Sequence, residues 1–173
     1  MDHLITLRHK DIFPADFVVP KKSIFPIERI AVRIIAIDEE GCIALCGTKY
    51  ELLPGGGVDE RETFEESAMR EAKEEIGCDV EIINEIGTSE EWRYDDTCHQ
   101  VTHCFLAKVI GEKQAPTTTQ EDEVGIKVYW YRPKETLKIL ENQARTIPFE
   151  SYNASFNVRT SKAFVEKYIS DFS

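Results

Sequence analysis

The sequence predicts an α+β fold, in which helices cover a mixed β-sheet to form an α-β-α sandwich. Three observations lead to this fold class. Runs rich in β-branched and aromatic residues alternate with segments of helical periodicity, and turn residues separate them. The 173 residues suffice for one sizeable core. No repeat, low-complexity tract or linker divides the chain, so we expect a single domain over residues 1–173.

The first elements along the chain are expected to be strands. Residues 1–26 contain three prolines and predict a short strand or an irregular lead-in. Residues 28–38 form a β-rich run that ends at the turn residues Glu39-Glu40-Gly41, and the apolar run 42–48 follows. The two runs together predict a β-hairpin.

The remaining elements alternate between strands and helices. Further strands are expected at residues 50–54, 78–94, 100–111 and 126–132. Helices are expected at about residues 60–76, from Pro133 to about Asn142, and at residues 157–171 as a closing amphipathic helix.

The segment from Gly56 to Cys78, GGVDERETFEESAMREAKEEIGC, contains the most informative pattern in the chain. Glu71, Glu74 and Glu75 are spaced i, i+3 and i+4, so their carboxylates lie on one face of a helix. Three like charges on adjacent turns repel one another, and a hard divalent cation neutralises them. Because oxygen ligands suit Mg²⁺ or Mn²⁺, the glutamates predict a site for one of these cations.

The residues around the glutamates favour the same prediction. The glycine run Gly55-Gly56-Gly57 lets the backbone approach a ligand closely. Glu62 precedes Arg70 by eight residues, and the pair can orient the loop and hold Arg70 away from the metals if the chain folds back. The alternative is a solvated charged helix, which requires neither the glycine run nor this spacing.

These residues match the signature of the Nudix hydrolases, G-x5-E-x7-R-E-U-x-E-E-x-G-U, where U is a bulky apolar residue. Every glycine and charged position is present, and the two U positions carry Ala72 and Cys78. A looser resemblance to the family extends from about Glu28 to about Leu140. It implies a Nudix-type sandwich and hydrolysis of a nucleoside diphosphate linked to another group X.

The resemblance also implies roles for individual residues. Glu74 and Glu75 resemble direct metal ligands, and Glu71 resembles a further ligand or the base that acts through a metal-bound water. The carbonyl of Gly55 or Gly56 often completes the metal shell in this family. Two further residues resemble the structural ion pair of the motif, namely Glu62 and Arg70.

Family members often recruit one more carboxylate from a loop after the motif. The candidates are Glu121, Asp122 and Glu123, and we rank Glu123 first and Glu121 second. An exposed acidic loop is the alternative for each of them.

Substrate contacts are expected from the backbone of Gly56 and Gly57 and from Trp92, Arg93 and Tyr94. Aromatic rings stack on bases and arginine pairs with phosphate, whereas ordinary packing is the alternative for Trp92 and Tyr94. Tyr94 stands about where the dinucleoside polyphosphate hydrolases of the family tend to carry a tyrosine. Three more cations able to reach phosphates are Arg8, Arg33 and Lys49.

A second cluster, Cys98, His99, His103 and Cys104, has the residue types of a zinc site. On a strand, however, the two histidines face opposite to the two cysteines, so the four cannot converge. The strand pattern therefore favours ordinary packing.

The composition limits the class of partner. The net charge of −11 argues against a basic surface that binds nucleic-acid polymers. Five cysteines without a disulfide framework, no signal-peptide plan and no long apolar run predict a soluble cytoplasmic protein without a membrane partner. The sequence leaves open whether it is a monomer or a homodimer.

The sequence thus predicts a Mg²⁺-dependent pyrophosphohydrolase that cleaves a diphosphate linkage in a small-molecule nucleotide. The substrate is either a nucleoside triphosphate, oxidised forms included, or a dinucleoside polyphosphate. ADP-ribose or a nucleotide sugar is the alternative within the same class. Two alternatives of other classes are a non-catalytic domain that senses nucleotides and an isoprenoid diphosphate isomerase.

Overall fold

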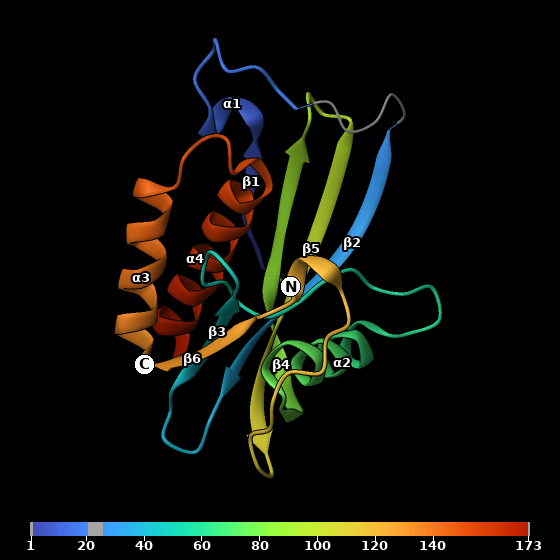
Figure 1. Ribbon diagram of the computed structural model, residues 1–173, viewed down its shortest axis with the longest axis vertical. Coiled ribbons are helices and arrows are strands. Elements are labelled where there is room, and N and C mark those ends of the chain that lie inside the picture. The colour runs from blue at the N-terminus through green and yellow to red at the C-terminus, as the bar shows by residue number, and fades with distance from the viewer. Residues whose placement is uncertain (1, 21–25, 173) are drawn as a thin grey trace.

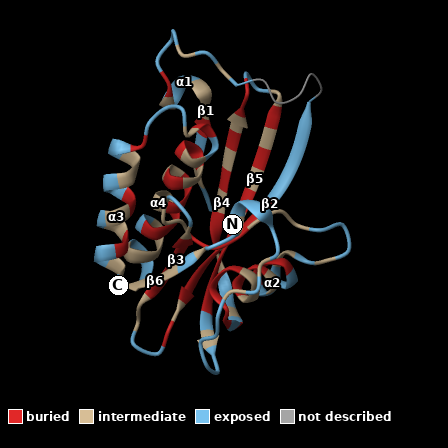
Figure 2. Ribbon diagram, viewed as in Figure 1, coloured by how far each residue is buried: buried red, intermediate tan, exposed pale blue. Residues whose placement is uncertain are grey.

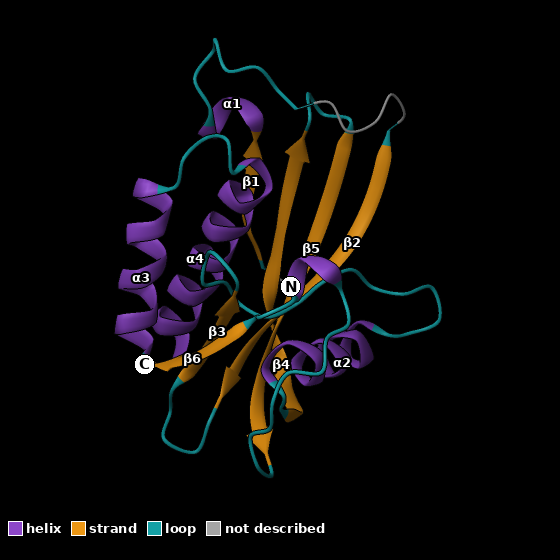
Figure 3. Ribbon diagram, in the orientation of Figure 1, coloured by secondary structure: helices purple, strands orange, loops and turns teal. Residues whose placement is uncertain are grey.

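A computed structural model describes residues 2–20 and 26–172 and shows a six-stranded mixed sheet with helices on both faces (Figures 1 and 3). The predicted α+β sandwich is confirmed. The strands are β1 (His3–Arg8), β2 (Ile27–Ile37), β3 (Ile43–Gly47), β4 (Asp79–Arg93), β5 (Cys98–Ile110) and β6 (Lys127–Tyr131). The helices are α1 (His9–Ile12), α2 (Phe64–Ile76), the 3₁₀ turn η1 (Glu121–Glu123), α3 (Pro133–Thr146) and α4 (Tyr152–Phe172).

The sheet has the order β1-β4-β5-β2-β3-β6. The long strands β4 and β5 pair antiparallel, whereas β5 with β2 and β4 with β1 pair parallel. Part of the N-terminal lead-in therefore forms an edge strand. The lead-in also includes residues 21–25, which lie outside the described residues.

The expected hairpin of β2 and β3 forms only at its base, where Ile37 pairs with Ile43. Further along, residues 52–58 lie between the two strands. The N–H of Val32 donates to the carbonyl of Gly56 at 2.9 Å, and Leu52 exchanges two backbone hydrogen bonds with Cys46 of β3. This insertion carries the glycine run into the middle of the sheet.

Two hydrophobic cores lie on opposite faces of the sheet (Figure 2). On one face, Ala68, Ala72 and Ile76 of α2 pack against Val32 and Ile34 of β2. The other face is covered by α3 and α4 through a core that includes Ile35, Leu45, Leu140, Phe164 and Val165. None of the described helices is long and apolar enough to cross a bilayer.

Helix α2 begins at Phe64, four residues later than the expected start at about residue 60. The hydroxyl of Thr63 accepts from the N–H of Glu66, and the Glu66 carboxylate accepts from the N–H of Thr63. This capping box satisfies two N–H groups at the start of the helix and fixes its first turn. At the other end, Gly77 adopts a left-handed conformation with φ of 66°.

The two C-terminal helices are longer than the sequence pattern predicts. Helix α3 continues to Thr146 rather than ending near Asn142. Helix α4 begins at Tyr152 rather than residue 157, because Tyr152 and Phe156 are buried in an aromatic cluster with Phe13 of the N-terminal segment. The predicted boundary missed this contact because it joins opposite ends of the chain.

Candidate active site

A cleft of about 940 Å³ extends from α2, past the glycine segment, to side chains of the sheet and α4. The carboxylates that line it come from α2, η1 and the loop before α2, namely Glu71, Glu74, Glu75, Asp122, Glu123 and Asp59. The arginines that line it come from α2, β2 and β4, namely Arg70, Arg29, Arg33 and Arg93. The cleft therefore brings a set of acidic oxygens and a set of cationic donors into one cavity.

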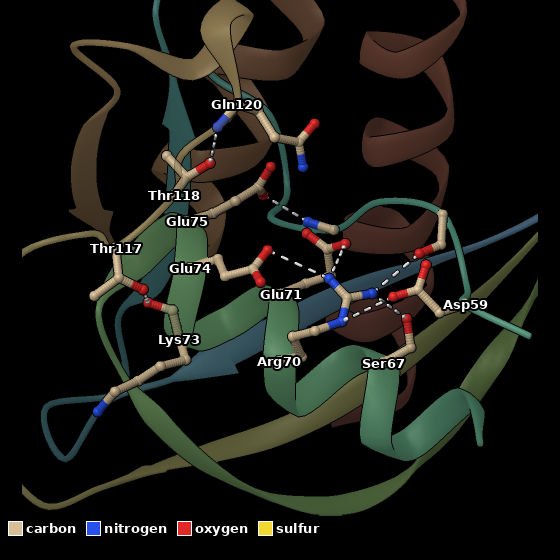
Figure 4. A network of polar contacts seen from close by, with 12 residues as sticks. Asp59, Ser67, Arg70, Glu71, Lys73, Glu74, Glu75, Thr117, Thr118 and Gln120 are labelled. Carbon is tan, nitrogen blue, oxygen red and sulfur yellow. Dashed lines mark hydrogen bonds and ion pairs between the residues drawn. The ribbon is translucent and has the colours of Figure 1, made fainter. Parts of the chain in front are cut away.

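Arg70 is the centre of a hydrogen-bond network beneath the glycine segment (Figure 4). Its Nε and Nη2 donate to the two carboxylate oxygens of Glu62 at 3.0 and 2.7 Å, and Nη2 also donates to the carbonyl of Gly57 at 3.1 Å. The bidentate contact with Arg70 lowers the pKa of Glu62 to about 2 and raises the pKa of Arg70. These bonds attach the loop before the helix to α2.

Arg70 also contacts two of the clustered glutamates. Its Nη1 lies 2.8 Å from Glu71 Oε1 and 3.3 Å from Glu74 Oε2. The sequence led us to expect that Glu62 would hold Arg70 away from the metals. In the structure Arg70 binds Glu62 with one side of its guanidinium and neutralises the cluster with the other, because a planar guanidinium offers donors in several directions.

Glu71 and Glu75 are both buried, at 2% and 7% exposure. Glu75 Oε2 accepts from the N–H of Gly55 at 2.7 Å. Burial, with the charges of Glu71 and Glu123, raises the pKa of Glu75 to about 7, although Arg33 and the Gly55 N–H oppose the shift. Burial likewise raises the pKa of Glu71.

Gly55 and Gly56 lie so close to their neighbours that a side chain at either position would collide. A Cβ atom on Gly55, whose φ is 149°, would lie 2.0 Å from the carbonyl oxygen of Val32. One on Gly56 would lie 2.4 Å from Glu71 Oε1. The two carbonyls have different partners: that of Gly56 accepts from the sheet, and that of Gly55 accepts from Arg33 Nη1 at 3.1 Å.

The donor set fits a hard divalent cation, since three carboxylates on one helix face supply only oxygen ligands. Within residues 2–20 and 26–172, however, no three His, Cys, Asp or Glu side chains are already grouped to hold a metal ion. Glu71 and Glu74 share Arg70 instead, and Glu75 accepts from Gly55. Arg70 contacts one oxygen each of Glu71 and Glu74, so a cation bound here either shares these carboxylates with Arg70 or displaces it.

The downstream loop reaches the cleft and is fastened to α2. The N–H groups of Thr117 and Thr118 both donate to the carbonyl of Glu74, at 2.9 and 3.0 Å. The hydroxyl of Thr118 donates to the Glu123 carboxylate. Glu123 and Asp122 line the cleft, whereas Glu121 does not and is exposed.

The three expected substrate contacts diverge. Trp92 and Arg93 end β4, where successive side chains point to opposite faces, and Tyr94 lies in the turn that follows, with φ of 54°. Arg93 lines the cleft. Trp92 stacks instead on His99 of β5, with ring centroids 4.0 Å apart, and Arg8 lies over its ring. Tyr94 is buried beside Tyr152, although its hydroxyl donates to Asn153 at the cleft wall. Of the three additional cations, Arg33 and Lys49 line the cleft.

The cysteines and histidines of residues 98–104 have separate surroundings. Cys98 and Cys104 are buried in the cores on the α3 and α4 side. His99 Nδ1 and Nε2 each lie 2.6 Å from a carboxylate oxygen, of Glu28 and Glu90, and His103 Nδ1 lies 2.6 Å from Glu85.

The cleft also contains polar residues that the sequence pattern did not single out, among them Arg29, Gln100, Asn153 and Asn157. Arg29 is opposite Gln100 in the parallel pair of β2 and β5. The spacing of Asn153 and Asn157, four residues apart, places both on one helix face. That spacing could have indicated a polar helix face. Its position beside Arg93 and Gln100 follows only from the packing of α4 on the sheet.

The comparisons with known proteins agree with this architecture. The model of the NUDIX domain matches residues 27–150. The RNA pyrophosphohydrolase of Hydrogenovibrio crunogenus is 33% identical over 87 residues, which cover 48% of this chain and 53% of that protein. The RNA pyrophosphohydrolase of Wolbachia pipientis subsp. Culex pipiens is 36% identical over 66 residues, or 38% of this chain and 40% of that protein. The chain thus spans about half the length of the curated relatives it matches, or less.

Solved structures share the fold at low sequence identity. A MutT protein from Methanosarcina mazei Go1 superposes with a TM-score of 0.58 at 18% identity, covering 87% of this chain and 100% of that one. A NUDIX hydrolase from Nitrosomonas europaea superposes with a TM-score of 0.60 at 14% identity. The match covers 83% of this chain and 89% of that one. At these identities the likeness concerns the fold alone.

Proposed function

Because the chain belongs to the Nudix family, we propose that it is a Mg²⁺-dependent pyrophosphohydrolase that cleaves a diphosphate linkage in a nucleotide. The observation that carries this proposal is the placement of Glu71, Glu74 and Glu75 on the wall of a cleft. In the described part of the chain, the same cleft is lined by the side chains of four arginines. Carboxylates suit the cation, and arginines suit the phosphate oxygens.

In this proposal Glu71, Glu74 and Glu75 hold the cation, with the Gly55 carbonyl and Glu123 as further oxygen donors. When bound, a divalent cation neutralises phosphate charge and lowers the pKa of a water. Glu71 or Glu123 accepts the proton of the attacking water.

Arg70 and Glu62 keep the glycine segment attached to α2, so that the carboxylates stay aimed into the cleft. The backbone of Gly56 and Gly57 leaves room for the phosphate chain, since neither residue carries a side chain. Arg33, which binds the Gly55 carbonyl, supplies positive charge beside the glutamates.

The proposed substrates are nucleoside triphosphates, oxidised ones included, and dinucleoside polyphosphates, with ADP-ribose or a nucleotide sugar as the alternative. A second candidate is the 5′ phosphate chain of an RNA end. It is favoured by the curated relatives, which are RNA pyrophosphohydrolases. We also propose a cytoplasmic location, where thiols stay reduced, because all five cysteines are free.

The test is a phosphate-release screen with Mg²⁺ and a coupled pyrophosphatase or phosphatase. The panel contains nucleoside triphosphates with 8-oxo forms, dinucleoside polyphosphates, ADP-ribose, nucleotide sugars and a 5′-triphosphorylated RNA oligonucleotide. Each is assayed with the wild type and with Glu74→Gln. Hydrolysis by the wild type and not by the variant supports the proposal and identifies X. Nucleotide binding without hydrolysis of any substrate would favour the non-catalytic sensor instead.

A further inference from the structure

The part of the cleft beside α4 contains a polar recess, which we define by Arg29, Arg93, Gln100, Asn153 and Asn157. Arg93 and Gln100 are 5% and 4% exposed and form the floor of the recess, whereas Arg29 and Asn153 are exposed at its rim. Asn153 and Asn157 lie on α4, beyond the segment that matches the NUDIX domain. The recess is thus built partly from residues outside the family motif.

Arg93 holds the two asparagines in one orientation. Its Nε and Nη2 bind the Glu91 carboxylate, its Nη1 donates to Asn153 Oδ1 at 3.0 Å, and its Nη2 donates to Asn157 Oδ1 at 2.8 Å. A guanidinium can only donate, so each amide must turn its oxygen toward Arg93. The NH₂ groups of Asn153 and Asn157 are left as donors on the cleft wall. The charge of Arg93 itself is neutralised by the buried Glu91.

Gln100 and Arg29 complete the set. Gln100 Nε2 donates to Thr102 Oγ1 at 3.0 Å, which leaves the Gln100 oxygen as an acceptor. Arg29 has no hydrogen-bond or ion-pair partner among the described residues, and a Cβ on Gly57 would lie 3.5 Å from its Nη2. Desolvation in the cleft, and then the charges of Arg93 and Arg33, lower the pKa of Arg29. Among the described residues, no carboxylate forms an ion pair with Arg29, although the charge of Glu91 acts on it at longer range.

We propose that this recess binds the nucleobase of the substrate and selects guanine, an inference that rests on the proposed function. The recess offers one guanidinium, two NH₂ groups and one carbonyl oxygen, so its donors outnumber its acceptors. The guanine edge presents two acceptors, O6 and N7, which pair with arginine in a bidentate contact, and its ring N1–H suits the Gln100 oxygen. Adenine places an NH₂ group where guanine has O6, so it sets a donor against the donors of the recess.

A base fits the recess better than a second phosphate does. Only Arg29 adds net charge, whereas the other donors are neutral amides with fixed directions, which are typical of base recognition. An aromatic ring is available nearby, because Tyr50 lines the cleft and its hydroxyl lies 2.9 Å from Ser151 Oγ, two residues before Asn153. Such a ring provides a face on which a base can stack.

The experiment measures the dissociation constants of GMP and AMP by calorimetric or NMR titration, for the wild type and for Asn157→Asp. These monophosphates contain no diphosphate linkage, so their binding does not depend on hydrolysis. The aspartate keeps an oxygen for Arg93 and replaces the cleft-facing donor by an acceptor. The matched control is Asn142→Asp on α3, where Asn142 Oδ1 accepts from Arg145 at 2.7 Å outside the cleft.

We expect the wild type to bind GMP about 10-fold or more tightly than AMP, since a good base contact discriminates by roughly 5- to 150-fold. Asn157→Asp should reduce this ratio by about 10-fold, and Asn142→Asp should leave it unchanged. Equal affinities in the wild type, or a ratio that Asn157→Asp does not alter, would overturn the inference. Base preference without hydrolysis of any diphosphate would contradict the proposed function alone, and hydrolysis without base preference would contradict the recess alone.

Discussion

Glu75 Oε2 accepts a hydrogen bond of 2.7 Å from the backbone N–H of Gly55. The carbonyl of Gly55 accepts a second hydrogen bond, of 3.1 Å, from Arg33 Nη1. The N–H of Gly55 is therefore bound by a carboxylate of α2, and its carbonyl is bound by a guanidinium of β2. The two contacts fix α2 relative to the sheet, so the carboxylates and the arginines of the cleft keep one spacing.

Glu74→Gln should lower kcat by about 100-fold or more, because it removes one charged ligand from the proposed cation site. The fold should be retained with little change in the unfolding free energy, because relief of repulsion between the glutamates offsets the lost contact with Arg70. Steady-state kinetics on the substrate found by the screen, together with urea unfolding, check both parts. Glu65→Gln, on the exposed side of the same helix, is the matched control. An unchanged kcat in Glu74→Gln would contradict the proposal that Glu74 is a ligand of the cation.

Gly56→Ala should destabilise the protein by about 1–3 kcal/mol, since its Cβ would meet Glu71 Oε1 at 2.4 Å in a packed site. Gly57→Ala should cost less than about 0.5 kcal/mol, because its Cβ meets only the Arg29 guanidinium at 3.5 Å. Urea denaturation of the two variants measures this difference. Equal unfolding midpoints would show that Glu71 can move aside freely.

Gly77→Ala should be more damaging than Gly111→Ala, although both glycines have left-handed φ, of 66° and 70°. The Gly111 substitution meets no atom within 4 Å, so it should cost only the backbone strain of about 1–2 kcal/mol. At Gly77 the Cβ would lie 1.9 Å from the carbonyl of Gln114, so the end of α2 has to shift as well. Thermal unfolding measures the loss of stability in each variant, and we expect the larger loss for Gly77→Ala. Equal losses in the two variants would contradict the predicted collision at Gly77.

The stability contributed by His99 should depend on pH. Both ring nitrogens lie 2.6 Å from carboxylates, so both must carry protons, and this joins Glu28 of β2 to Glu90 of β4 across β5. Burial opposes the charged form, but the hydrogen bonds to Glu28 and Glu90 outweigh it and raise the pKa of His99. A raised pKa stabilises the fold below the unfolded value of about 6.5, and the contribution is lost as pH rises through the folded value.

His99→Gln should therefore lower the unfolding free energy by about 1–2 kcal/mol near pH 5.5, and the loss should shrink by pH 9. Urea unfolding at several pH values measures the difference between variant and wild type. His3→Gln, an exposed histidine whose ring contacts Thr6, is the control. A loss that stays constant over this range would mean that His99 acts through packing on Trp92 rather than through its charge.

The sequence predicted those parts of the molecule that are encoded locally. The spacing of Glu71, Glu74 and Glu75 predicted a helix with an acidic face, and those residues do line one cleft. The start of that helix was encoded but not recognised: Thr63 and Glu66 have the spacing of a capping box, whereas the predicted start was about residue 60. Strand alternation separates Trp92 from Arg93, so their divergence in the structure follows from the period of two.

Other features depend on contacts between distant segments and had no local pattern. The early start of α4 comes from Tyr152, whose ring stacks on Phe13 with centroids 4.7 Å apart. Likewise, Arg29 and Asn157 share a cleft only because the sheet order places β5 between β2 and β4 and because α4 covers them. Neither residue belongs to a motif, so no spacing rule could bring them together.

The parallel pairing of β1 with β4, in which His3 is aligned with Thr88, has a consequence for synthesis of the chain. The ribosome makes β1 long before its partner strand, and α4, which Lys167 ties back to Asp2 at 2.9 Å, emerges after both. The residues of the carboxylate wall have all been made once β6 is complete. The recess beside α4 is complete only after Asn153 and Asn157 have been made. A partly translated chain therefore contains the glutamates of the cleft before it contains the asparagines of the recess.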